Sequence, residues 1–147
     1  MINIRSAGPA DLATAVAWLN GAGLPSSDLS NEHMRSFLVA LRDGEPVGMI
    51  GIETYPDCGL LRSLFVAESG RDAGLGARLV AELERTAAAA GLRALWLLTI
   101  DAENYFTRLG YETVERSAAP ESVQQSAEFS SLCPGDAVLM RKSLAND

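Results

Sequence analysis

Residues 66–80 read VAESGRDAGLGARLV. They begin in an apolar strand, Leu60–Ala67, that is hydrophobic enough to be central in a sheet. A short polar loop follows, and a helix is predicted from about Gly74 to Ala90 because apolar residues recur there at helical spacing: Leu75, Leu79, Leu83 and Ala87. Gly91 stands where a helix C-terminus is expected. This stretch therefore predicts a buried strand that leads directly into an amphipathic helix.

The loop in this stretch has the composition of an anion-binding site. Gly74 and Gly76 allow the backbone to approach a ligand closely, and Arg71 adds a positive charge. The first N–H groups of a helix have no partner inside the helix, and the helix dipole favours a negative charge there. Such a loop suits a pyrophosphate. Its spacing matches neither the P-loop nor the Rossmann loop, and an ordinary strand–helix turn stays open as the alternative.

The rest of the chain alternates between strand and helix periodicity. The pattern predicts a strand at residues 1–6, a helix from Pro9 to about Asn20, a hairpin of Phe37–Leu41 and Val47–Thr54, a strand at Leu92–Ile100, a helix at Ala102–Leu109, and strands at Tyr111–Arg116 and Ala137–Lys142. Residues 24–34 are polar and irregular, with room for a short helix, and a further polar segment surrounds Pro120. This order predicts one α/β domain over residues 1–147, with helices on the faces of a mixed sheet.

Composition and charge narrow the class of protein. Of the 147 residues, 48% are hydrophobic and 21% are charged, which is typical of a globular domain. Lys and Arg number 12 against 19 Asp and Glu, and the net charge of −7 argues against nucleic acid as a partner. Two cysteines, Cys58 and Cys133, form no disulfide framework and fit a reducing compartment. The first residues lack a signal-peptide pattern, and Ala94–Ile100, the longest apolar stretch, is too short to span a membrane. We therefore expect a cytoplasmic protein with no membrane partner.

Two motifs resemble those of the GNAT superfamily of N-acetyltransferases. The first, Arg71-x-x-Gly74-x-Gly76, begins five residues after a strand that ends in Leu64-Phe65-Val66, and it resembles the coenzyme A loop of that family. The second, AENYFTRLGY at residues 102–111, resembles a short helix that ends in Leu-Gly-aromatic. The resemblance covers about residues 1–143. It implies the GNAT fold, an α/β (α+β) arrangement with a mixed sheet of about six or seven strands, about four flanking helices, and splayed fourth and fifth strands.

The stretch AEFSSLCPGDAVLM at residues 127–140 resembles a narrower group. This group comprises small bacterial acetyltransferases found with arsenic-resistance operons, which are similar to the catalytic domain of N-acetylglutamate synthases. The resemblance implies an enzyme that moves an acetyl group from acetyl-CoA to the amine of a small, amino-acid-like molecule, by direct attack in a ternary complex. It also implies a link to resistance against arsenic or another toxic compound. Two cysteines far apart in sequence make no convincing thiolate site, so we expect Cys133 to be a small buried side chain rather than an arsenic ligand.

The resemblance also assigns residues to coenzyme A. The pantetheine arm would contact backbone groups near Phe65, Val66 and Ala67, in the gap between the splayed strands. The pyrophosphate would lie on the amides of residues 71–76, which are Arg71, Asp72, Ala73, Gly74, Leu75 and Gly76. Asp72 replaces the glycine that is usual in the family. A carboxylate beside a pyrophosphate is unfavourable unless it points to solvent or pairs with a neighbour.

In the second motif, Asn104 and Phe106 are expected at the cofactor. The family often has a tyrosine four residues before the glycine, which protonates the departing thiolate; here that position holds Phe106, which cannot donate a proton. Phe106 is therefore expected to pack against the coenzyme. Tyr105 should face about 100° away on a helix, and we expect a structural role for it. For Asn104, a polar residue at a helix start is the alternative.

Glu53 is the predicted catalytic base. It ends the third strand and adjoins the fourth, where the acetyl group should lie, so a partly desolvated carboxylate there could accept the proton of the amine. A solvated acid at a strand end is the alternative. His33, the single histidine, falls in a segment that lines the acceptor site in the family, with a surface histidine as the alternative. No metal site is predicted.

Arg62, Glu128 and Ser131 are the predicted substrate-binding residues. Arg62 is a charge inside an apolar strand, and a buried charge needs a partner. It would suit a substrate carboxylate if it faces the acceptor cleft, whereas an ion pair with an acid such as Glu53 or Glu128 is the alternative. Glu128 and Ser131 precede the last strand, which closes one side of the acceptor site in the family.

Two other functions stay open. One is a non-catalytic acyl-CoA-binding sensor, because the usual tyrosine of the second motif is missing. The other is a protein lysine acetyltransferase, since an acidic groove attracts basic tails, although Arg62 in the cleft argues against it. We expect a small-molecule amine as the acceptor and a monomer or homodimer as the assembly, because dimers are common in the family.

Overall fold

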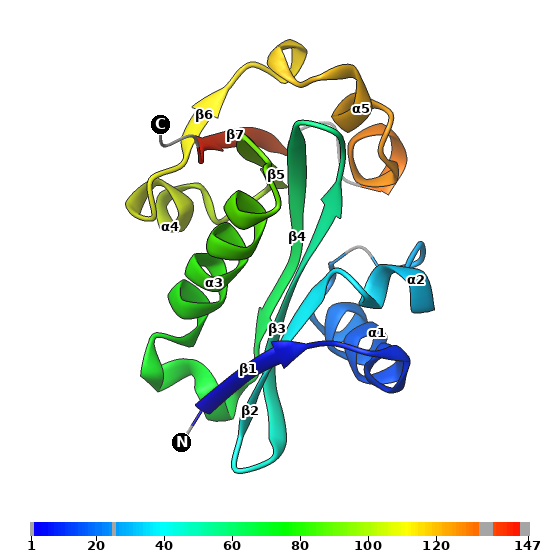
Figure 1. Cartoon of the computed structure of the whole chain (residues 1–147), viewed down its shortest axis with the longest axis vertical. Coiled ribbons are helices and arrows are strands. Elements are labelled where there is room, and N and C mark those ends of the chain that lie inside the picture. Colours follow the sequence, from blue (N-terminus) through cyan, green and yellow to red (C-terminus); the bar gives the residue numbers. More distant parts are fainter. Residues whose placement is uncertain (1, 25, 133–136, 145–147) are drawn as a thin grey trace.

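The computed structural model describes residues 2–24, 26–132 and 137–144, without the side chains of residues 71–73 and 131–132. In chain order the elements are β1 (Ile2–Ser6), a 3-10 turn at Pro9–Asp11, α1 (Leu12–Ala22), α2 (Asn31–Met34), β2 (Phe37–Arg42), β3 (Glu45–Thr54), β4 (Cys58–Val66), a 3-10 segment at Glu68–Ala73, α3 (Leu75–Ala89), β5 (Ala94–Thr99), α4 (Glu103–Arg108), β6 (Glu112–Val114), a 3-10 turn at Arg116–Ala118, α5 (Glu121–Gln124), a π-helical segment at Glu128–Leu132, and β7 (Val138–Ser143). Figure 1 shows how these elements are arranged.

The strands form a seven-stranded mixed sheet in the order β1-β2-β3-β4-β5-β7-β6. Every neighbouring pair is antiparallel except β4 and β5, which run parallel. A parallel pair needs a crossover connection, and α3 supplies it. The predicted fold is therefore confirmed: a mixed sheet with helices on its faces.

The β4 and β5 strands separate soon after they meet. Their pairing covers three residue pairs, Cys58–Ala94, Gly59–Leu95 and Leu60–Trp96. Beyond Leu60, β4 continues to Val66 against β3 on its other side. Among the described strands, none pairs with this part of β4 along the edge that faces β5. The expected splay of the fourth and fifth strands is thus present.

A β-bulge lies on β4 where the two strands diverge. Gly51 of β3 pairs with Arg62, and Met49 pairs with Phe65, so that two residues of β4 oppose one residue of β3. The extra residue falls at Ser63 and Leu64, and Ser63 has a φ of 63°. A bulge leaves a residue out of the hydrogen-bond ladder and changes where the next side chains point. The backbone of β4 is therefore irregular at the point where it leaves β5.

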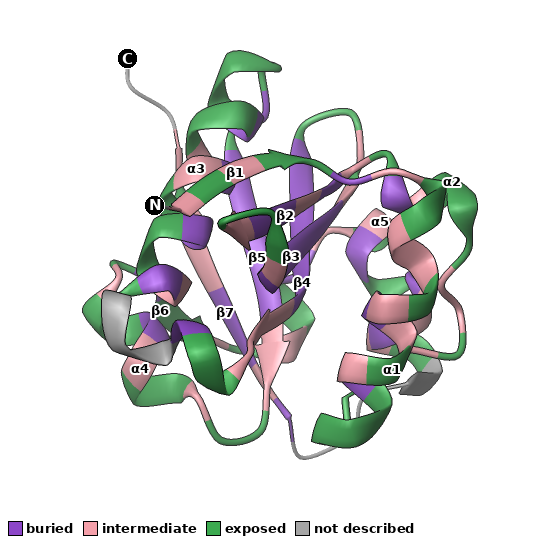
Figure 2. Cartoon of the chain, turned by 90° about the horizontal axis from the view of Figure 1, so that it is seen from below, coloured by how far each residue is buried: buried purple, intermediate pink, exposed green. Residues whose placement is uncertain are grey.

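The hydrophobic core occupies both faces of the sheet. On one face, α3 packs on the sheet with Leu79 and Leu83, and α4 adds Phe106. On the other face, α1 and α2 cover β2 and β3 with Leu19 and Met34, while the segment with α5 covers β4, β5 and β7. Figure 2 shows the buried strands between α3 and α4 on one side and α1, α2 and α5 on the other. No helix among the described residues is long and apolar enough to cross a membrane.

Two segments differ from the predicted elements. The strand predicted at Tyr111–Arg116 is shorter, at Glu112–Val114, because the backbone N–H of Tyr111 still donates to the end of α4 and a 3-10 turn begins at Arg116. The polar segment around Pro120 contains α5 and the π-helical segment, neither of which is predicted from the sequence. Both helices are one turn or slightly longer, so the sequence has no helical periodicity to detect.

The close contact between Phe37 of β2 and Gly51 of β3 allows the described packing to be tested by substitution. A Cβ atom at Gly51 would collide with the ring of Phe37, a residue that is buried in the core. We therefore expect Gly51→Ala to lower the free energy of unfolding by about 1–3 kcal/mol, as overpacked cores do. At Gly21 in α1 no atom lies within 4 Å of the Cβ position. The control variant Gly21→Ala should instead stabilise the protein by about 0.5–1 kcal/mol. Urea denaturation measures both; a Gly51→Ala variant as stable as the wild type would contradict the described contact.

Candidate active site

A cleft of about 700 Å³ opens where β4 and β5 diverge. Its walls come from residues 61–64 of β4, residues 97–102 at the end of β5, and Tyr105 and Phe106 of α4. The end of α1 and the loop that follows it close another side, and Glu128 lies in the wall as well. The cleft therefore lies along the part of β4 that follows its last residue pair with β5.

The loop before α3 brings a helix N-terminus to this region. Gly74 has a φ of +65°, a left-handed conformation that disfavours other residues, and it precedes the first residue of α3. At Gly76 a Cβ atom would meet the hydroxyl of Tyr105, which lines the cleft. Leu75 between them is buried in the core and anchors the helix start. The side chains of Arg71, Asp72 and Ala73 lie outside the described residues, so their predicted roles stay predictions.

The predicted pantetheine residues continue β4 past the cleft wall. Phe65 turns its ring to the opposite face, where it stacks on Trp18 of α1 with ring centres 5.0 Å apart. The N–H of Ala67 donates to the carbonyl of Val47 at 2.8 Å, so the strand end is tied to β3. Phe65 and Val66 lie beyond Leu60, the last residue of β4 that pairs with β5.

The second motif forms α4, and two of its aromatic residues line the cleft. Phe106 is buried and makes edge contacts with the rings of Tyr105 and Tyr111. Tyr105 is less buried, and its burial raises the pKa of its hydroxyl. Asn104, which with Phe106 is predicted to lie at the cofactor, is exposed on the first turn of α4 and is not among the residues that line the cleft. Both aromatic side chains are thus placed to contact a ligand in the cleft.

Arg62 of β4 has a fully buried side chain that holds three carboxylates. Its Nη1 donates to Asp28 Oδ2 at 2.6 Å and to Glu53 Oε2 at 2.7 Å, and its Nη2 donates to Asp28 Oδ1 at 2.9 Å. Its Nε donates to Ser63 Oγ at 3.0 Å and lies 3.3 Å from Glu128 Oε2. We call Arg62, Asp28, Glu53 and Glu128 the Arg62 cluster. Its formal charge is one positive against three negative.

The acids of the Arg62 cluster respond differently to burial. Burial acts to raise the pKa of Asp28, but the hydrogen bonds from Arg62 outweigh it and the pKa is lowered. Burial raises the pKa of Glu128 to about 7, and the nearby Glu53 and Asp28 add to the rise while Arg62 opposes it. For Arg62 burial acts to lower the pKa, yet its acid partners raise it above the ordinary value. Glu128 is thus an acid that changes its charge near neutral pH.

Glu53 is held at both of its carboxylate oxygens. Oε2 accepts from Arg62, and Oε1 accepts from the hydroxyl of Tyr55 at 2.9 Å. Burial, together with the negative charge of Glu53, raises the pKa of Tyr55. Glu53 is not among the residues that line the cleft. The predicted base therefore lies behind Arg62, and its role as a base stays a prediction.

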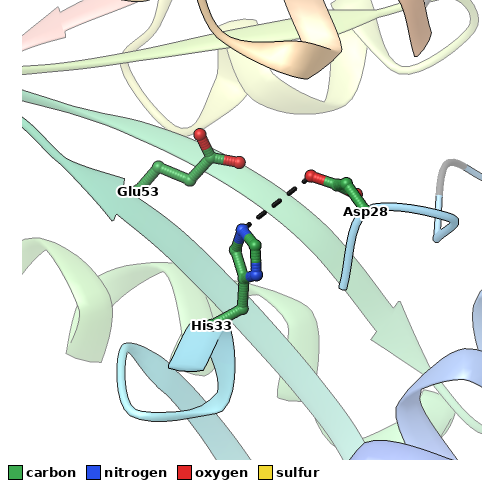
Figure 3. Close-up of side chains that lie close together, drawn as sticks. All are labelled: Asp28, His33 and Glu53. Carbon is green, nitrogen blue, oxygen red and sulfur yellow. Dashed lines mark ion pairs between the residues drawn. The ribbon is translucent and has the colours of Figure 1, made fainter. Parts of the chain in front are cut away.

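His33 of α2 lies beside the same acids. Figure 3 shows Asp28, His33 and Glu53 with their side chains turned toward one another, and His33 Nε2 is 3.9 Å from Asp28 Oδ2. One ligand atom from each of the three lies within 4.8 Å of the others. The Arg62 guanidinium already binds the same carboxylates of Asp28 and Glu53, so a metal cation would have to compete with it.

The Arg62 cluster unites predicted residues with one that the sequence does not single out. The ion pairs of Arg62 with Glu53 and Glu128, the alternative considered from the sequence, are present. A substrate carboxylate at Arg62 would have to displace one of these acids. Asp28 was not predicted, because it lies in the irregular segment 24–34, where no periodicity marks which side chains turn inward. The side chain of Ser131 and all of Cys133 lie outside the described residues.

Comparison with known proteins identifies related chains. Residues 11–111 match the model of the "Acetyltransferase (GNAT) family". An uncharacterized N-acetyltransferase of Chlorobaculum tepidum, CT2212, is 32% identical over 93 residues, 63% of this chain and 59% of that protein. The amino-acid acetyltransferase of Neisseria meningitidis serogroup A is 27% identical over 99 residues, 66% of this chain and 23% of that protein. The chain thus spans less than two thirds of the length of these curated relatives.

Solved structures share the fold over nearly the whole chain. N-acetylglutamate synthase from Neisseria gonorrhoeae, in complex with coenzyme A and N-acetyl-glutamate, has a TM-score of 0.85 at 23% identity, and the match covers 99% of this chain and 36% of that one. Rv2747 from Mycobacterium tuberculosis, solved with CoA, has a TM-score of 0.83 at 21% identity, with 97% and 99% covered. At these identities the likeness concerns the fold.

The Arg62 cluster predicts a large, pH-dependent loss of stability when Arg62 is removed. Arg62→Met leaves three acids without their cation, and removing one partner of a buried ion pair costs about 3–5 kcal/mol. Because Arg62 lowers the pKa of Asp28, its contribution is fully present above the ordinary aspartate pKa of about 3.9 and is lost as the pH falls through the lowered pKa. The loss should therefore be smaller at about pH 2 than at neutral pH.

Urea denaturation at the two pH values measures this effect. Arg85→Met is the control, since Arg85 is exposed on α3, and its effect should stay within about 0.5 kcal/mol. An equal loss for Arg62→Met at both pH values would show that the acids do not depend on Arg62.

Proposed function

Because the chain belongs to the acetyltransferase (GNAT) family, we propose that it transfers an acetyl group from acetyl-CoA to the amine of a small molecule. The observation that carries this proposal is the cleft of about 700 Å³ between the diverging strands β4 and β5, with the start of α3 beside it. An unpaired strand edge offers N–H and C=O groups, and a helix N-terminus offers N–H groups to an anion. Coenzyme A needs both, since it joins an amide-containing arm to a pyrophosphate.

The residues of this chain fit that cofactor. Phe65, Val66 and Ala67 would lie beside the pantetheine arm, because they follow the point where β4 has separated from β5. The backbone of residues 71–76 would hold the pyrophosphate, because it includes the left-handed Gly74 and the first turn of α3. Tyr105 and Phe106 line the cleft and would contact the coenzyme from α4. The two structural neighbours from Neisseria gonorrhoeae and Mycobacterium tuberculosis, both solved with coenzyme A, support this assignment.

The proposed reaction is a direct transfer with both substrates bound. The amine nitrogen attacks the thioester carbonyl carbon, a C–N bond forms, and the C–S bond breaks. Holding two reactants in the right geometry can supply about 7–11 kcal/mol of the barrier reduction. The bulge at Ser63 and Leu64 lies in the cleft wall. Backbone amides that a bulge takes out of the hydrogen-bond ladder can orient the thioester carbonyl.

The proposed acceptor is a small, amino-acid-like amine. The relatives named amino-acid acetyltransferases and the synthase complex with N-acetyl-glutamate support this choice. One observation favours a second candidate, an amine without a carboxylate such as a polyamine, because Arg62 is already engaged by three acids. A link to arsenic resistance, a cytoplasmic location and the assembly state stay predictions from the sequence.

Turnover measurements distinguish the candidates. We expect thiol release from acetyl-CoA when glycine, L-glutamate, L-lysine, putrescine or spermidine is added, with the N-acetylated product identified by mass spectrometry. A preference for L-glutamate would support the amino-acid acceptor, and a preference for putrescine or spermidine would support the carboxylate-free amine. If coenzyme A binds in calorimetry but no amine or lysine-bearing peptide causes thiol release, the protein is a sensor and the proposed enzyme function is wrong.

Because α3 starts beside the cleft, we predict that a substitution at its start weakens the binding of coenzyme A. Gly76→Val places a branched side chain against Tyr105 and Val66, at the point where α3 meets the cleft. We expect coenzyme A binding in calorimetry to weaken by more than about tenfold, which corresponds to about 1.4 kcal/mol. Gly8→Ala is the control, because no atom lies within 4 Å of the Cβ position at Gly8. Unchanged binding by a folded Gly76→Val protein would exclude this loop as the coenzyme A site.

A further inference from the structure

The three acids of the Arg62 cluster differ in what they face. Glu128 lines the cleft, whereas Asp28 and Glu53 are not among the cleft-lining residues. The Glu128 side chain is nevertheless only 5% exposed, so it meets the cleft from a largely buried position. It begins the π-helical segment that leads toward β7, opposite residues 61–64 of β4. One acid of the cluster is therefore placed where an acceptor would enter.

The same three acids also differ in how fully they are bound. Arg62 donates to both oxygens of Asp28, and Glu53 accepts from Arg62 at one oxygen and from Tyr55 at the other. Glu128 has a single contact among the described residues, from its Oε2 to Arg62 Nε at 3.3 Å. Its second oxygen makes no hydrogen bond or ion pair with the described residues. Asp28 and Glu53 thus fix Arg62 in place, while Glu128 keeps hydrogen-bonding capacity toward the cleft.

The surroundings of Glu128 give it the character of a base near neutral pH. The charged groups that act on it are Arg62 on β4, Glu53 on β3 and Asp28 in the loop before α2. Burial and the two acids raise its pKa to about 7. A general base works best when its pKa lies near the working pH. An arriving ammonium ion would favour the ionised carboxylate, because opposite charges at short distance stabilise each other.

We propose that the carboxylate of Glu128 receives the acceptor as an ammonium ion and removes its proton before the amine attacks the thioester. This inference rests on the proposed function and names the group that prepares the acceptor. Arg62 and Glu53 are positioning residues that hold Glu128 and the β4 bulge together through the contacts of Arg62 with Glu128 and Ser63. Asp101 also lines the cleft, but it is exposed to solvent and has no buried partner cluster.

The proton and electron balance is complete without a further reactant. Glu128 takes one proton from the ammonium ion and becomes a neutral carboxylic acid. The nitrogen lone pair forms the C–N bond to the thioester carbonyl carbon, the electrons of the C–S bond leave with sulfur, and the departing thiolate takes the second proton from nitrogen. Glu128 then returns its proton to solvent. One proton is released for each acetyl group transferred.

The test is the pH dependence of kcat/KM for the best acceptor of the five amines in the turnover panel. The wild type should lose activity on the acid side of neutral pH, because Glu128 must be ionised to accept a proton. Glu128→Gln should lower kcat/KM at neutral pH by about 10²–10⁴-fold, the usual contribution of a general base. In this variant the acid limb should move to the alkaline pKa of the free acceptor amine, so that activity recovers at high pH.

Three further variants separate this role from a structural one. Glu128→Asp keeps a carboxylate and should keep the acid limb near neutral pH at a reduced rate. Glu53→Gln removes an acid that does not face the cleft; it should keep the limb but move it to lower pH, because the charge of Glu53 raises the pKa of Glu128. Glu121→Gln, on the exposed start of α5, is the control and should match the wild type. Thermal melting and coenzyme A calorimetry establish that each variant is folded and binds the cofactor.

Each outcome decides a different question. If the wild type acetylates an amine and Glu128→Gln keeps the wild-type acid limb, Glu128 is not the base and the inference is overturned. The same follows if a folded Glu128→Asp loses the limb, or if Glu53→Gln abolishes it while Glu128→Gln does not. If the wild type binds coenzyme A but acetylates none of the amines, the proposed function fails and the inference falls with it.

Discussion

The separation of β4 from β5 is the constraint on which the rest of the site depends. Two parallel strands that pair over three residues and then diverge separate one edge of β4 from the neighbouring strand β5 beyond Leu60. Buried backbone groups need hydrogen bonds, so such an edge is stable only where it meets solvent or a ligand. The divergence opens the cleft, and the bulge at Ser63 and Leu64 lies at its start. α3 begins near the C-terminal end of the same strand. The position of β4 therefore determines both where the pantetheine arm and where the pyrophosphate of coenzyme A would bind.

Arg62 connects segments that are distant in sequence, on the face of the sheet opposite α3. Its partners come from the loop before α2, from β3 and from the segment after α5, which are far apart in sequence. The α1 and α2 helices cover one half of this face and α5 covers the other half. The Arg62 cluster joins these halves with ionic contacts where the two apolar packings end. A buried cluster with more negative than positive charge is costly, and such a cost is typical of groups kept for chemistry rather than for stability.

Local periodicity predicted the sheet and the longer helices well, since α3, β4 and β5 carry their signals within a few residues. The two motifs also indicated the region of α3 and α4 correctly, because a glycine beside a helix start is a local feature. The partners of Arg62 were harder to predict. Asp28 lies in an irregular segment and reaches Arg62 across 34 positions of the chain, and α5 is a single turn without periodicity. Glu53 and Glu128 were both recognised as candidates, yet which of them faces the cleft depends on the bulge and on the path of the segment after α5, and neither has a sequence signature.

The C-terminal end of β4 and the middle of the strand differ in electrostatic character. The positive pole of α3 lies near the C-terminal end, and the Arg62 cluster, with its excess negative charge, lies at the middle of the strand. An anionic donor and a cationic acceptor would therefore be sorted along the cleft by the electric field as well as by shape. Because each ligand partly neutralises the potential that the other experiences, the two would bind with positive cooperativity, and this coupling is reciprocal. A strongly acidic protein of net charge −7 can thus attract a polyanion at one point, while the electrostatic potential over the rest of its surface favours cations.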